Sequence, residues 1–198
     1  MRALVTGGCG FIGSHLVAAL THSGHEVCVL DDLSTGRREN IAGSPARLIE
    51  ASIDEPSALR DALAEVDTLF HLAAMVSVPV SIRRPAACLR INVTATAALL
   101  EEAVASGVST VVFASSAAVY GSEDRGAQTE DQPLRPGNPY GVSKVTGEDL
   151  CRLLDNSGQV RAVSLRFFNI YGPRQDPQGS YGSVVPEFAR RALAGDSL

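Results

Sequence analysis

A tyrosine and a lysine stand four residues apart in the segment "NPYGVSK" (138–144). Asn138 has a side chain that caps helix N-termini, and Pro139 suits the first helical position, so we expect a helix to begin here. Tyr140 and Lys144 then lie one turn apart on the same helix face. Because a nearby ammonium group stabilises a phenolate, whose unperturbed pKa is about 10, this pair is suited to general base chemistry. An isolated pair of this kind could also be a tyrosine packed on a sheet and a lysine extended to solvent.

Two serines in "VVFASSAAVYG" (111–121) supply a partner for the tyrosine. Ser115 and Ser116 end an apolar run that predicts a strand, and ligands of open parallel sheets bind at the carboxyl ends of strands. Ser116 there can hydrogen-bond the oxygen whose proton Tyr140 removes. For Ser115, the alternative that it only satisfies backbone groups at the strand end stays open. We predict Ser116, Tyr140 and Lys144 as the catalytic residues.

The segment "VTGGCGFIGSHL" (5–16) carries a glycine pattern between a predicted strand and a predicted helix. Gly7, Gly10 and Gly13 are spaced G-x-x-G-x-x-G. Such glycines form a tight turn, let a pyrophosphate approach the backbone and let helix and strand pack closely, while the helix N-terminal amides bind the phosphates. The segment therefore predicts a dinucleotide-binding loop, provided that the next strand supports it.

An acidic residue at the end of the second apolar run gives that support. Asp31 follows this run, and a carboxylate there accepts hydrogen bonds from the adenosine ribose hydroxyls and repels a 2′-phosphate. Asp32 adds to the repulsion. Arg37 and Arg38 would favour NADP if they faced the ribose, but they follow the turn 33–36 and we assign them to the surface. The pattern predicts NAD as the cofactor.

Short apolar runs alternate along the chain with longer stretches of helical periodicity. The predicted strands are 2–6, 26–30, 46–51, 67–73, 109–115 and 160–168, and the predicted helices are 11–24, 55–66, 86–107 and 138–158. Nearly continuous apolar runs are typical of parallel strands buried on both faces. We therefore predict an α/β fold with a doubly wound parallel sheet (a Rossmann fold) over residues 1–168. Residues 169–198, a Gly- and Pro-rich loop and one further helix, are predicted to be the beginning of a small substrate-binding region that is incomplete.

Composition narrows the class of protein. The chain has 198 residues, 45% of them hydrophobic and 20% charged, with a net charge of −5. This charge argues against a nucleic-acid partner, and no apolar run is long enough to cross a membrane. The first residues contain no signal peptide pattern, so we expect a cytoplasmic protein with reduced thiols. We expect no metal site, because metal-ligand spacing is absent among the cysteines and histidines: Cys9, Cys28, Cys88, Cys151, His15, His22, His25 and His71.

Seven segments together resemble one known family. They are "VTGGCGFIGSHL", "LDDLSTG", "HLAA", "INVTAT", "SSAAVYG", "YGVSK" and "RFFNIYGPRQ". In this order they resemble the extended short-chain dehydrogenase/reductases, specifically the NAD-dependent sugar-nucleotide epimerases and dehydratases of the UDP-glucose 4-epimerase kind. The resemblance covers essentially the whole chain, and it is more specific for the family than for the substrate.

The resemblance implies a cofactor site assembled from several segments. Its expected members are Gly7, Gly10, Phe11, Ile12, Gly13, Asp31, Asp32, Ser34, Thr35, Gly36, Ser52, Ile53, Leu72, Ala73, Ala74, Asn92, Tyr140, Lys144 and Phe168. Phe168 is expected beside the nicotinamide. Ser116, Tyr140 and Asn169 are expected to contact the substrate, with Asn169 on its diphosphate. At two positions the chain departs from the family: relatives have an acid where Ser52 stands, and a glycine where Ala95 stands.

The residues after Ser116 separate the reactions of this family. Relatives that are dehydratases carry acidic residues there for proton transfer, and decarboxylating relatives keep the glutamate, whereas this chain has Ala117 and Ala118. Since alanine transfers no protons, we expect an isomerase that inverts C4 of a nucleotide sugar, a UDP-linked hexose, hexosamine or hexuronate. The alternatives are a 4,6-dehydratase or decarboxylase of the same family, or a fragment that binds NAD without turnover. The resemblance also implies a homodimer formed through a four-helix bundle of the helices 86–106 and 139–157.

Overall fold

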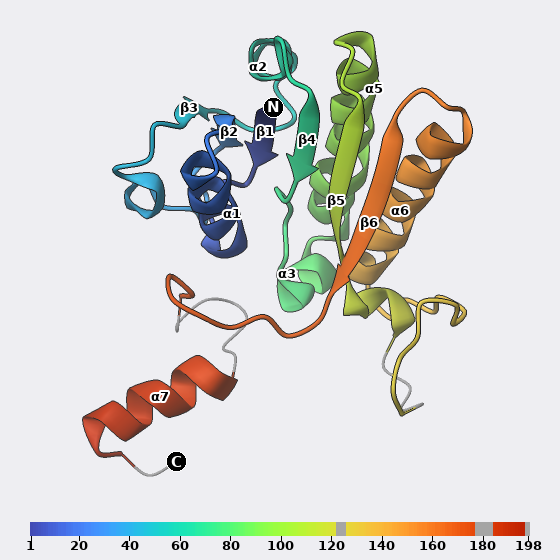
Figure 1. The fold of residues 1–198 in the computed structure, drawn as a ribbon. Coiled ribbons are helices and arrows are strands. Elements are labelled where there is room, and N and C mark those ends of the chain that lie inside the picture. Colours follow the sequence, from blue (N-terminus) through green and yellow to red (C-terminus); the bar gives the residue numbers. More distant parts are fainter. Residues whose placement is uncertain (122–125, 177–183, 197–198) are drawn as a thin grey trace.

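The computed structural model describes residues 1–121, 126–176 and 184–196. Its centre is a six-stranded sheet with the strand order β3-β2-β1-β4-β5-β6, in which all neighbouring strands are parallel (Figure 1). The strands are β1 (Arg2–Thr6), β2 (Glu26–Asp31), β3 (Arg47–Glu50), β4 (Thr68–His71), β5 (Thr110–Ser116) and β6 (Arg161–Phe167). The chain builds outward from β1 to β3 and then crosses to β4 on the other side of β1. The order thus reverses between β1 and β4, which is where such sheets bind ligands.

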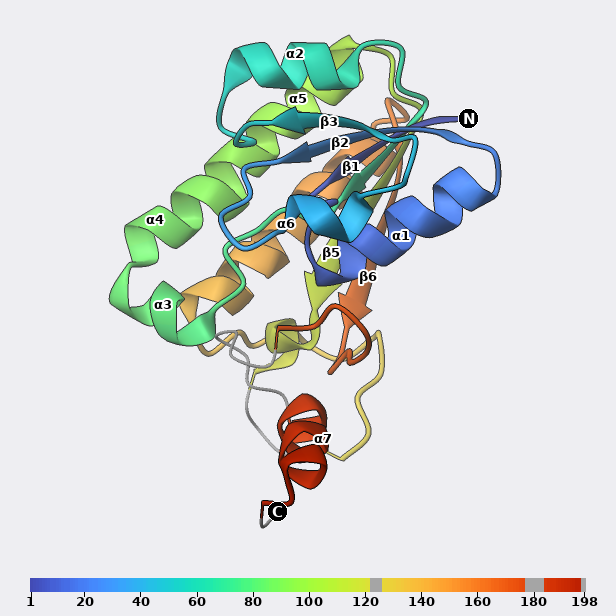
Figure 2. The ribbon, with the colours of Figure 1, turned by 90° about the vertical axis from the view of Figure 1, so that its left-hand side faces the viewer.

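Helices cover the two faces of the sheet unequally (Figure 2). One face carries α1 (Phe11–His22), and the other carries α2 (Pro56–Leu63), α5 (Thr96–Ala105) and α6 (Pro139–Asn156). Two core clusters follow from the alternation of side chains along each strand. On β1, Leu4 belongs to the cluster with α2, α5 and α6, whereas Val5 belongs to the cluster with α1. Both residues are fully buried, which explains the continuous apolar runs in the sequence.

Most of the predicted elements are confirmed. Each of the six predicted strands is present, with ends within three residues of the prediction. The helices predicted over 11–24, 55–66 and 138–158 correspond to α1, α2 and α6. Gly24, Gly107 and Gly158 all have positive φ values, of 78°, 79° and 72°, and follow the C-termini of α1, α5 and α6. Glycine takes this conformation without a steric cost, so these three residues end the helices.

The helix predicted over 86–107 differs from the observed structure. The chain forms α4 (Pro85–Leu89), a π-helical segment (Arg90–Ala95) and then α5. The π-helical turn places Asn92 in the protein interior, where it makes four hydrogen bonds to three other residues. Two of these partners, Met75 and Ser143, are distant in the sequence. The periodicity of the sequence therefore does not indicate that this turn holds one residue more than an α-helical turn. Ala95, where the family resemblance leads one to expect glycine, is 3% exposed and belongs to the core.

Three short elements were absent from the prediction: η1 (Arg38–Ile41), α3 (Val78–Arg83) and η3 (Ala117–Tyr120). Beyond β6, residues 168–176 form a loop and α7 (Val184–Ala194) lies apart from the sheet in both views (Figures 1 and 2). The division of the chain at residue 168 into two domains stays a prediction. Within the described ranges, no helix is both long and apolar enough to cross a bilayer.

Candidate active site

The glycine loop lies at the carboxyl end of β1, where α1 begins. Gly7 has a φ of +70°, and its amide donates to the carbonyl of Leu30 at 2.9 Å. A Cβ atom added to Gly13 would lie 2.1 Å from the carbonyl oxygen of Gly7, and one added to Gly7 would lie 2.8 Å from the amide nitrogen of Ala73. These positions therefore need glycine for close backbone packing. The arrangement directs the N-terminus of α1, with its free amides, to the reversal point of the sheet.

Asp31 ends β2 next to this loop and is 7% exposed. Its Oδ2 accepts the amide hydrogen of Cys9 at 2.9 Å, and its Oδ1 accepts that of Leu33 at 2.9 Å. Burial raises the pKa of this carboxyl, while the two amides oppose that rise. Gly36 lies so close that an added Cβ would be 2.9 Å from Oδ1 of Asp31. The structure thus brings together the glycine loop, the acid and the turn after β2, as the sequence predicts.

The neighbours of Asp31 agree with the surface role expected of the arginines. Asp32 accepts two hydrogen bonds from Ser34, from its amide at 3.0 Å and from its hydroxyl at 2.6 Å. Arg38 pairs with Glu50, and its side chain is 61% exposed. An arginine engaged in this way carries its own counter-ion, which weakens the case for a 2′-phosphate ligand.

The segment after β4 is held by a buried histidine and a threonine. Nδ1 of His71 lies 2.7 Å from Oγ1 of Thr6, and its Nε2 lies 2.9 Å from Oγ1 of Thr96. Oγ1 of Thr6 also accepts the amides of Leu72 and Ala73, both at 3.2 Å. Burial, with the charge of Lys144 as a second cause, lowers the pKa of His71 to about 3. His71 is therefore neutral at physiological pH and fixes the backbone beside the glycine loop.

Asn92 connects this same segment to α6. Its Oδ1 accepts the amide of Met75 at 2.8 Å, and its Nδ2 donates to the carbonyl of Met75 at 3.0 Å and to Oγ of Ser143 at 3.1 Å. Ser143 in turn donates to the carbonyl of Tyr140 at 2.7 Å. The side chain thus braces two segments of the candidate site, and its assignment as a cofactor contact stays a prediction.

The tyrosine and the lysine lie on the buried face of α6. Asn138 caps this helix by accepting the amide of Gly141 at 2.9 Å, which confirms the predicted start. Tyr140 is 7% exposed and Lys144 is 4% exposed. Nζ of Lys144 donates to the carbonyl of Ala114 at 2.8 Å and lies 5.7 Å from the centroid of the Tyr140 ring. Burial lowers the pKa of Lys144 to about 8.

Ser116 lies next to this pair at the end of β5. Its Oγ accepts the amide of Ala118 at 3.2 Å and so caps η3. The first turn of α6 lies directly against η3, because a Cβ atom added to Gly141 would be 2.7 Å from the carbonyl oxygen of Ala118. The structure therefore brings the segments of Ser116, Tyr140 and Lys144 together, which an isolated surface pair would not require.

The remaining predicted positions are placed less tightly. Phe168 is 56% exposed, and its ring centroid lies 6.3 Å from that of Tyr120. Asn169 is exposed in the loop after β6. Ile53 is 4% exposed and belongs to the core cluster on the α5 face, while the amide of Ser52 donates to Glu55 at 3.0 Å. For these residues the predicted contacts remain predictions.

Sequence reasoning missed three groups of buried polar residues: the Thr6–His71–Thr96 chain, Ser143, and the ion pair of Glu148 with Arg166. A local signal existed only for Glu148, which stands one helical turn after Lys144. The partners of the others come from distant segments, so spacing along the chain does not indicate them.

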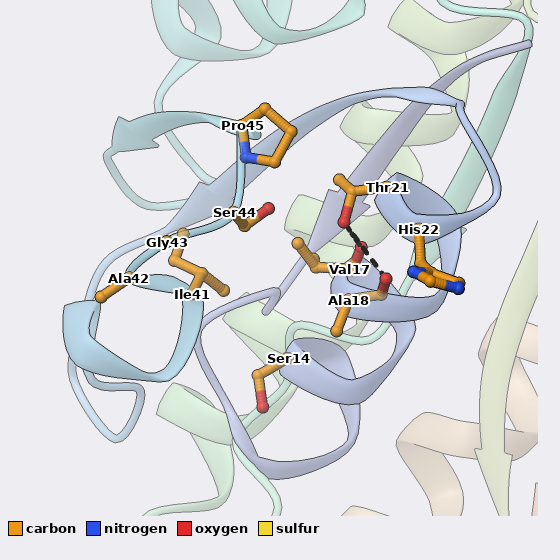
Figure 3. A pocket seen from close by; sticks show the side chains of 10 residues that line it. All are labelled: Ser14, Val17, Ala18, Thr21, His22, Ile41, Ala42, Gly43, Ser44 and Pro45. Carbon is orange, nitrogen blue, oxygen red and sulfur yellow. Dashed lines mark hydrogen bonds between the residues drawn. The ribbon is translucent and has the colours of Figure 1, made fainter.

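A further pocket of ≈ 350 Å³ lies between α1 and the segment 41–45, apart from these residues (Figure 3). Two of its lining hydroxyls bond within α1, where Thr21 donates to the carbonyl of Val17 and Ser14 donates to that of Phe11, and the hydroxyl of Ser44 accepts the amide of Ala46. Among the described residues, no cluster of His, Cys, Asp and Glu could hold a metal ion.

The fold and the glycine loop define an α/β protein of the Rossmann type. The model of the NAD dependent epimerase/dehydratase family matches residues 3–198, and the chain belongs to this family. A UDP-glucose 4-epimerase from Mycolicibacterium smegmatis is 41% identical over 202 residues, which cover 98% of this chain and 64% of that protein. A UDP-N-acetyl-alpha-D-glucosaminuronate decarboxylase from Bacillus cytotoxicus is 34% identical over 205 residues, which cover 100% of this chain and 63% of that protein.

Among solved structures, the UDP-glucose 4-epimerase of Thermus thermophilus in complex with NAD is similar, with a TM-score of 0.90 and 41% identity. The match covers 100% of this chain and 64% of that one. The present chain thus spans just under two thirds of the length of each of these three proteins.

Proposed function

We propose that this protein is an NAD-dependent isomerase that inverts C4 of a nucleotide sugar, a UDP-linked hexose, hexosamine or hexuronate. Family membership and the similarity to UDP-glucose 4-epimerases support the proposal. The observation that carries it is the convergence of Ser116, Tyr140 and Lys144 at one end of the sheet, with alanines at positions 117 and 118.

The cofactor half of the sheet suits NAD. The close packing at Gly7 and Gly13 leaves the amides at the start of α1 for a pyrophosphate, and a side chain on either glycine would fill this cradle. Asp31 is aimed at the loop and keeps acceptor capacity for ribose hydroxyls, since a carboxylate can accept about four hydrogen bonds. Asp31 and Asp32 together disfavour a 2′-phosphate. These residues fit the adenosine end of the dinucleotide.

The catalytic half of the sheet suits proton transfer. Bound NAD supplies a reversible hydride acceptor next to these residues. Tyr140 takes the proton of the C4 hydroxyl as general base, and Ser116 donates a hydrogen bond to the same oxygen. Lys144, whose pKa is about 8, remains mostly protonated at neutral pH and favours the phenolate of Tyr140. Loss of this proton, together with loss of the C4 hydrogen as hydride, would leave a 4-ketosugar. Once the ketosugar has turned over in the site, hydride would return to the opposite face of C4, and Tyr140 returns the proton to the C4 oxygen.

The residues of η3 favour inversion over the other reactions of the family. A dehydratase needs acidic side chains beside the serine to protonate a departing hydroxyl and remove a neighbouring proton. Here η3 presents Ala117 and Ala118 after Ser116. The similarity to a decarboxylase keeps that reaction as the second candidate. A protein that binds NAD without turnover is the third.

We further infer a cytoplasmic homodimer. All four cysteines are free, in keeping with a reducing compartment. For the dimer, the helical stretch 86–106 (α4 to α5) and α6 would pair with the same two stretches of a second copy across a two-fold axis, as a four-helix bundle. Exposed apolar residues on these helices support it: Leu89 is 37% exposed, Val142 43% and Leu153 59%. A monomer by light scattering at micromolar concentration would contradict the dimer.

The proposed function is tested by incubating the complete natural protein with UDP-galactose, UDP-N-acetylglucosamine and UDP-glucuronate and analysing the products. We expect a C4-inverted product from at least one substrate, with bound NAD retained. NAD binding without an inverted product from any of the three would overturn the epimerase proposal. Release of carbon dioxide from the uronate would favour the decarboxylase instead.

A further inference from the structure

A nearly buried ion pair lies behind the proposed catalytic residues. Arg166 of β6 binds Glu148 of α6 through two parallel hydrogen bonds, from Nη2 to Oε2 at 2.9 Å and from Nε to Oε1 at 3.0 Å. The two side chains are 19% and 11% exposed. Because desolvation offsets most of the attraction in such a pair, its net stabilising effect is often small. The role of this pair therefore lies in the other residues that it holds in place.

Each partner extends the pair toward the candidate site. Glu148 also accepts a hydrogen bond from the hydroxyl of Ser115, which is 2% exposed and directly precedes Ser116. Nη1 of Arg166 donates to the hydroxyl of Tyr120 at 2.9 Å, and the guanidinium carbon lies 5.0 Å from the centre of the Tyr120 ring. Tyr120 ends η3, the turn that begins immediately after Ser116. The pair thus touches both ends of the segment 115–120.

Two hydrogen bonds join α6, the helix that carries Tyr140, to β5. In one, Lys144 donates to the carbonyl of Ala114, and in the other, one helical turn further on, Glu148 accepts from the hydroxyl of Ser115. Tyr140, Lys144 and Glu148 follow one another at one-turn intervals and so share a helix face. A slide of α6 along β5 would break both ties, so the two ties set the distance from Ser116 to Tyr140.

We propose that Glu148 and Arg166 are positioning residues, which act through Ser115 and Tyr120 to fix Ser116 and η3 against the phenol of Tyr140. This inference rests on the proposed function and adds a cause for the geometry that the reaction requires. Since a displacement of about 1 Å in a reacting group can cost about 10²-fold in rate, loosening this support lowers kcat more than substrate affinity.

Two mild variants test the proposal, because each removes one hydroxyl and leaves the ion pair in place. Ser115→Ala breaks the tie to β5, and Tyr120→Phe breaks the tie to η3. We expect each to lower kcat per NAD-loaded site about tenfold, with KM changed less than about threefold. Glu148→Ala removes both the acceptor of the Ser115 hydroxyl and the carboxylate that holds Arg166 beside Tyr120, and it is expected to lower kcat about 10²-fold. In these variants we also expect a changed fraction of reduced nicotinamide during turnover, followed by its near-ultraviolet absorbance.

The matched control is Arg152→Ala, which breaks an exposed ion pair with Asp149 on the same helix, at 2.7 Å and with side chains 64% and 54% exposed. It should leave both kcat and the reduced fraction unchanged. Ser115→Ala and Tyr120→Phe proteins with the kcat of this control would overturn the inference alone, even if their melting temperatures fell. A wild-type protein that inverts no nucleotide sugar would instead overturn the proposed function, and this inference with it.

Discussion

The half of the sheet formed by β1–β3 holds its predicted cofactor residues through backbone geometry, whereas the half formed by β4–β6 holds its predicted catalytic residues through buried side chains. In the first half, Gly7 and Gly13 pack backbone against backbone and Asp31 binds two backbone amides. In the second, Lys144, Ser115 and Glu148 link two elements by side-chain hydrogen bonds. The backbone cradle is suited to bind a cofactor, whereas the buried side chains set protonation states. Substitutions in the first half should therefore lower NAD affinity, and substitutions in the second half should change pH-dependent stability and turnover.

The largest effect is expected at the backbone cradle. Gly13→Ala places a Cβ atom where only 2.1 Å separates it from the carbonyl of Gly7, so the loop must shift and NAD affinity should fall below detection. The measurement is NAD content after purification, with isothermal titration of the stripped protein. Gly137→Ala is the matched control, because an added Cβ meets nothing within 4 Å there. NAD retention by Gly13→Ala at the level of this control would contradict the role of the cradle.

The second largest effect is expected on the free energy of unfolding at acidic pH, and it comes from His71 at the end of β4, in the other half of the sheet. The pKa of His71 is about 3 in the folded protein against a reference value of 6.5, so the unfolded chain binds more protons between these values. Stability that is present above pH 6.5 is therefore lost as the pH falls, by about 1.4 kcal/mol for each pH unit in this window.

His71→Gln removes this titration while keeping polar groups near Thr6 and Thr96. Urea unfolding at pH 7 and pH 4.5 should show a smaller loss on acidification for the variant than for the wild type. His22→Gln, at an exposed position of α1, is the control and should keep the full loss. Equal pH dependence in wild type and His71→Gln would show that His71 does not stay neutral.

The smallest effect is a gain in the free energy of unfolding when Lys144 is replaced. Its folded pKa of about 8 lies below its reference value of 10.5, so burying the charged form costs stability below pH 8, and this cost disappears as the pH rises toward 10.5. Lys144→Met removes the charge but also the hydrogen bond to Ala114. We expect a net gain of about 1–2 kcal/mol in the free energy of unfolding at pH 7, with turnover lost. Chemical denaturation at pH 7 and pH 10 checks this, and a gain that grows with pH would contradict it.

The sequence predicted local features well and non-local ones poorly. Asn138 caps α6 and glycines end three helices because these preferences act within a few residues. The glycine loop is equally local. By contrast, the π-helical turn at Asn92 depends on Met75 and Ser143, and the placement of the His71 ring depends on hydrogen bonds to Thr6 and Thr96. Such contacts form only after the fold has brought distant segments together, and a single sequence carries no periodic signal for them.

Tyr140 is the group proposed to move the proton, and one substitution tests this role directly. Tyr140→Phe removes the phenolic hydroxyl and keeps the ring on the buried face of α6. In the complete natural protein, with wild-type NAD content as the check on folding, we predict a fall in kcat for C4 inversion of about 10²- to 10⁴-fold. Inversion at an undiminished rate in this variant would contradict the account.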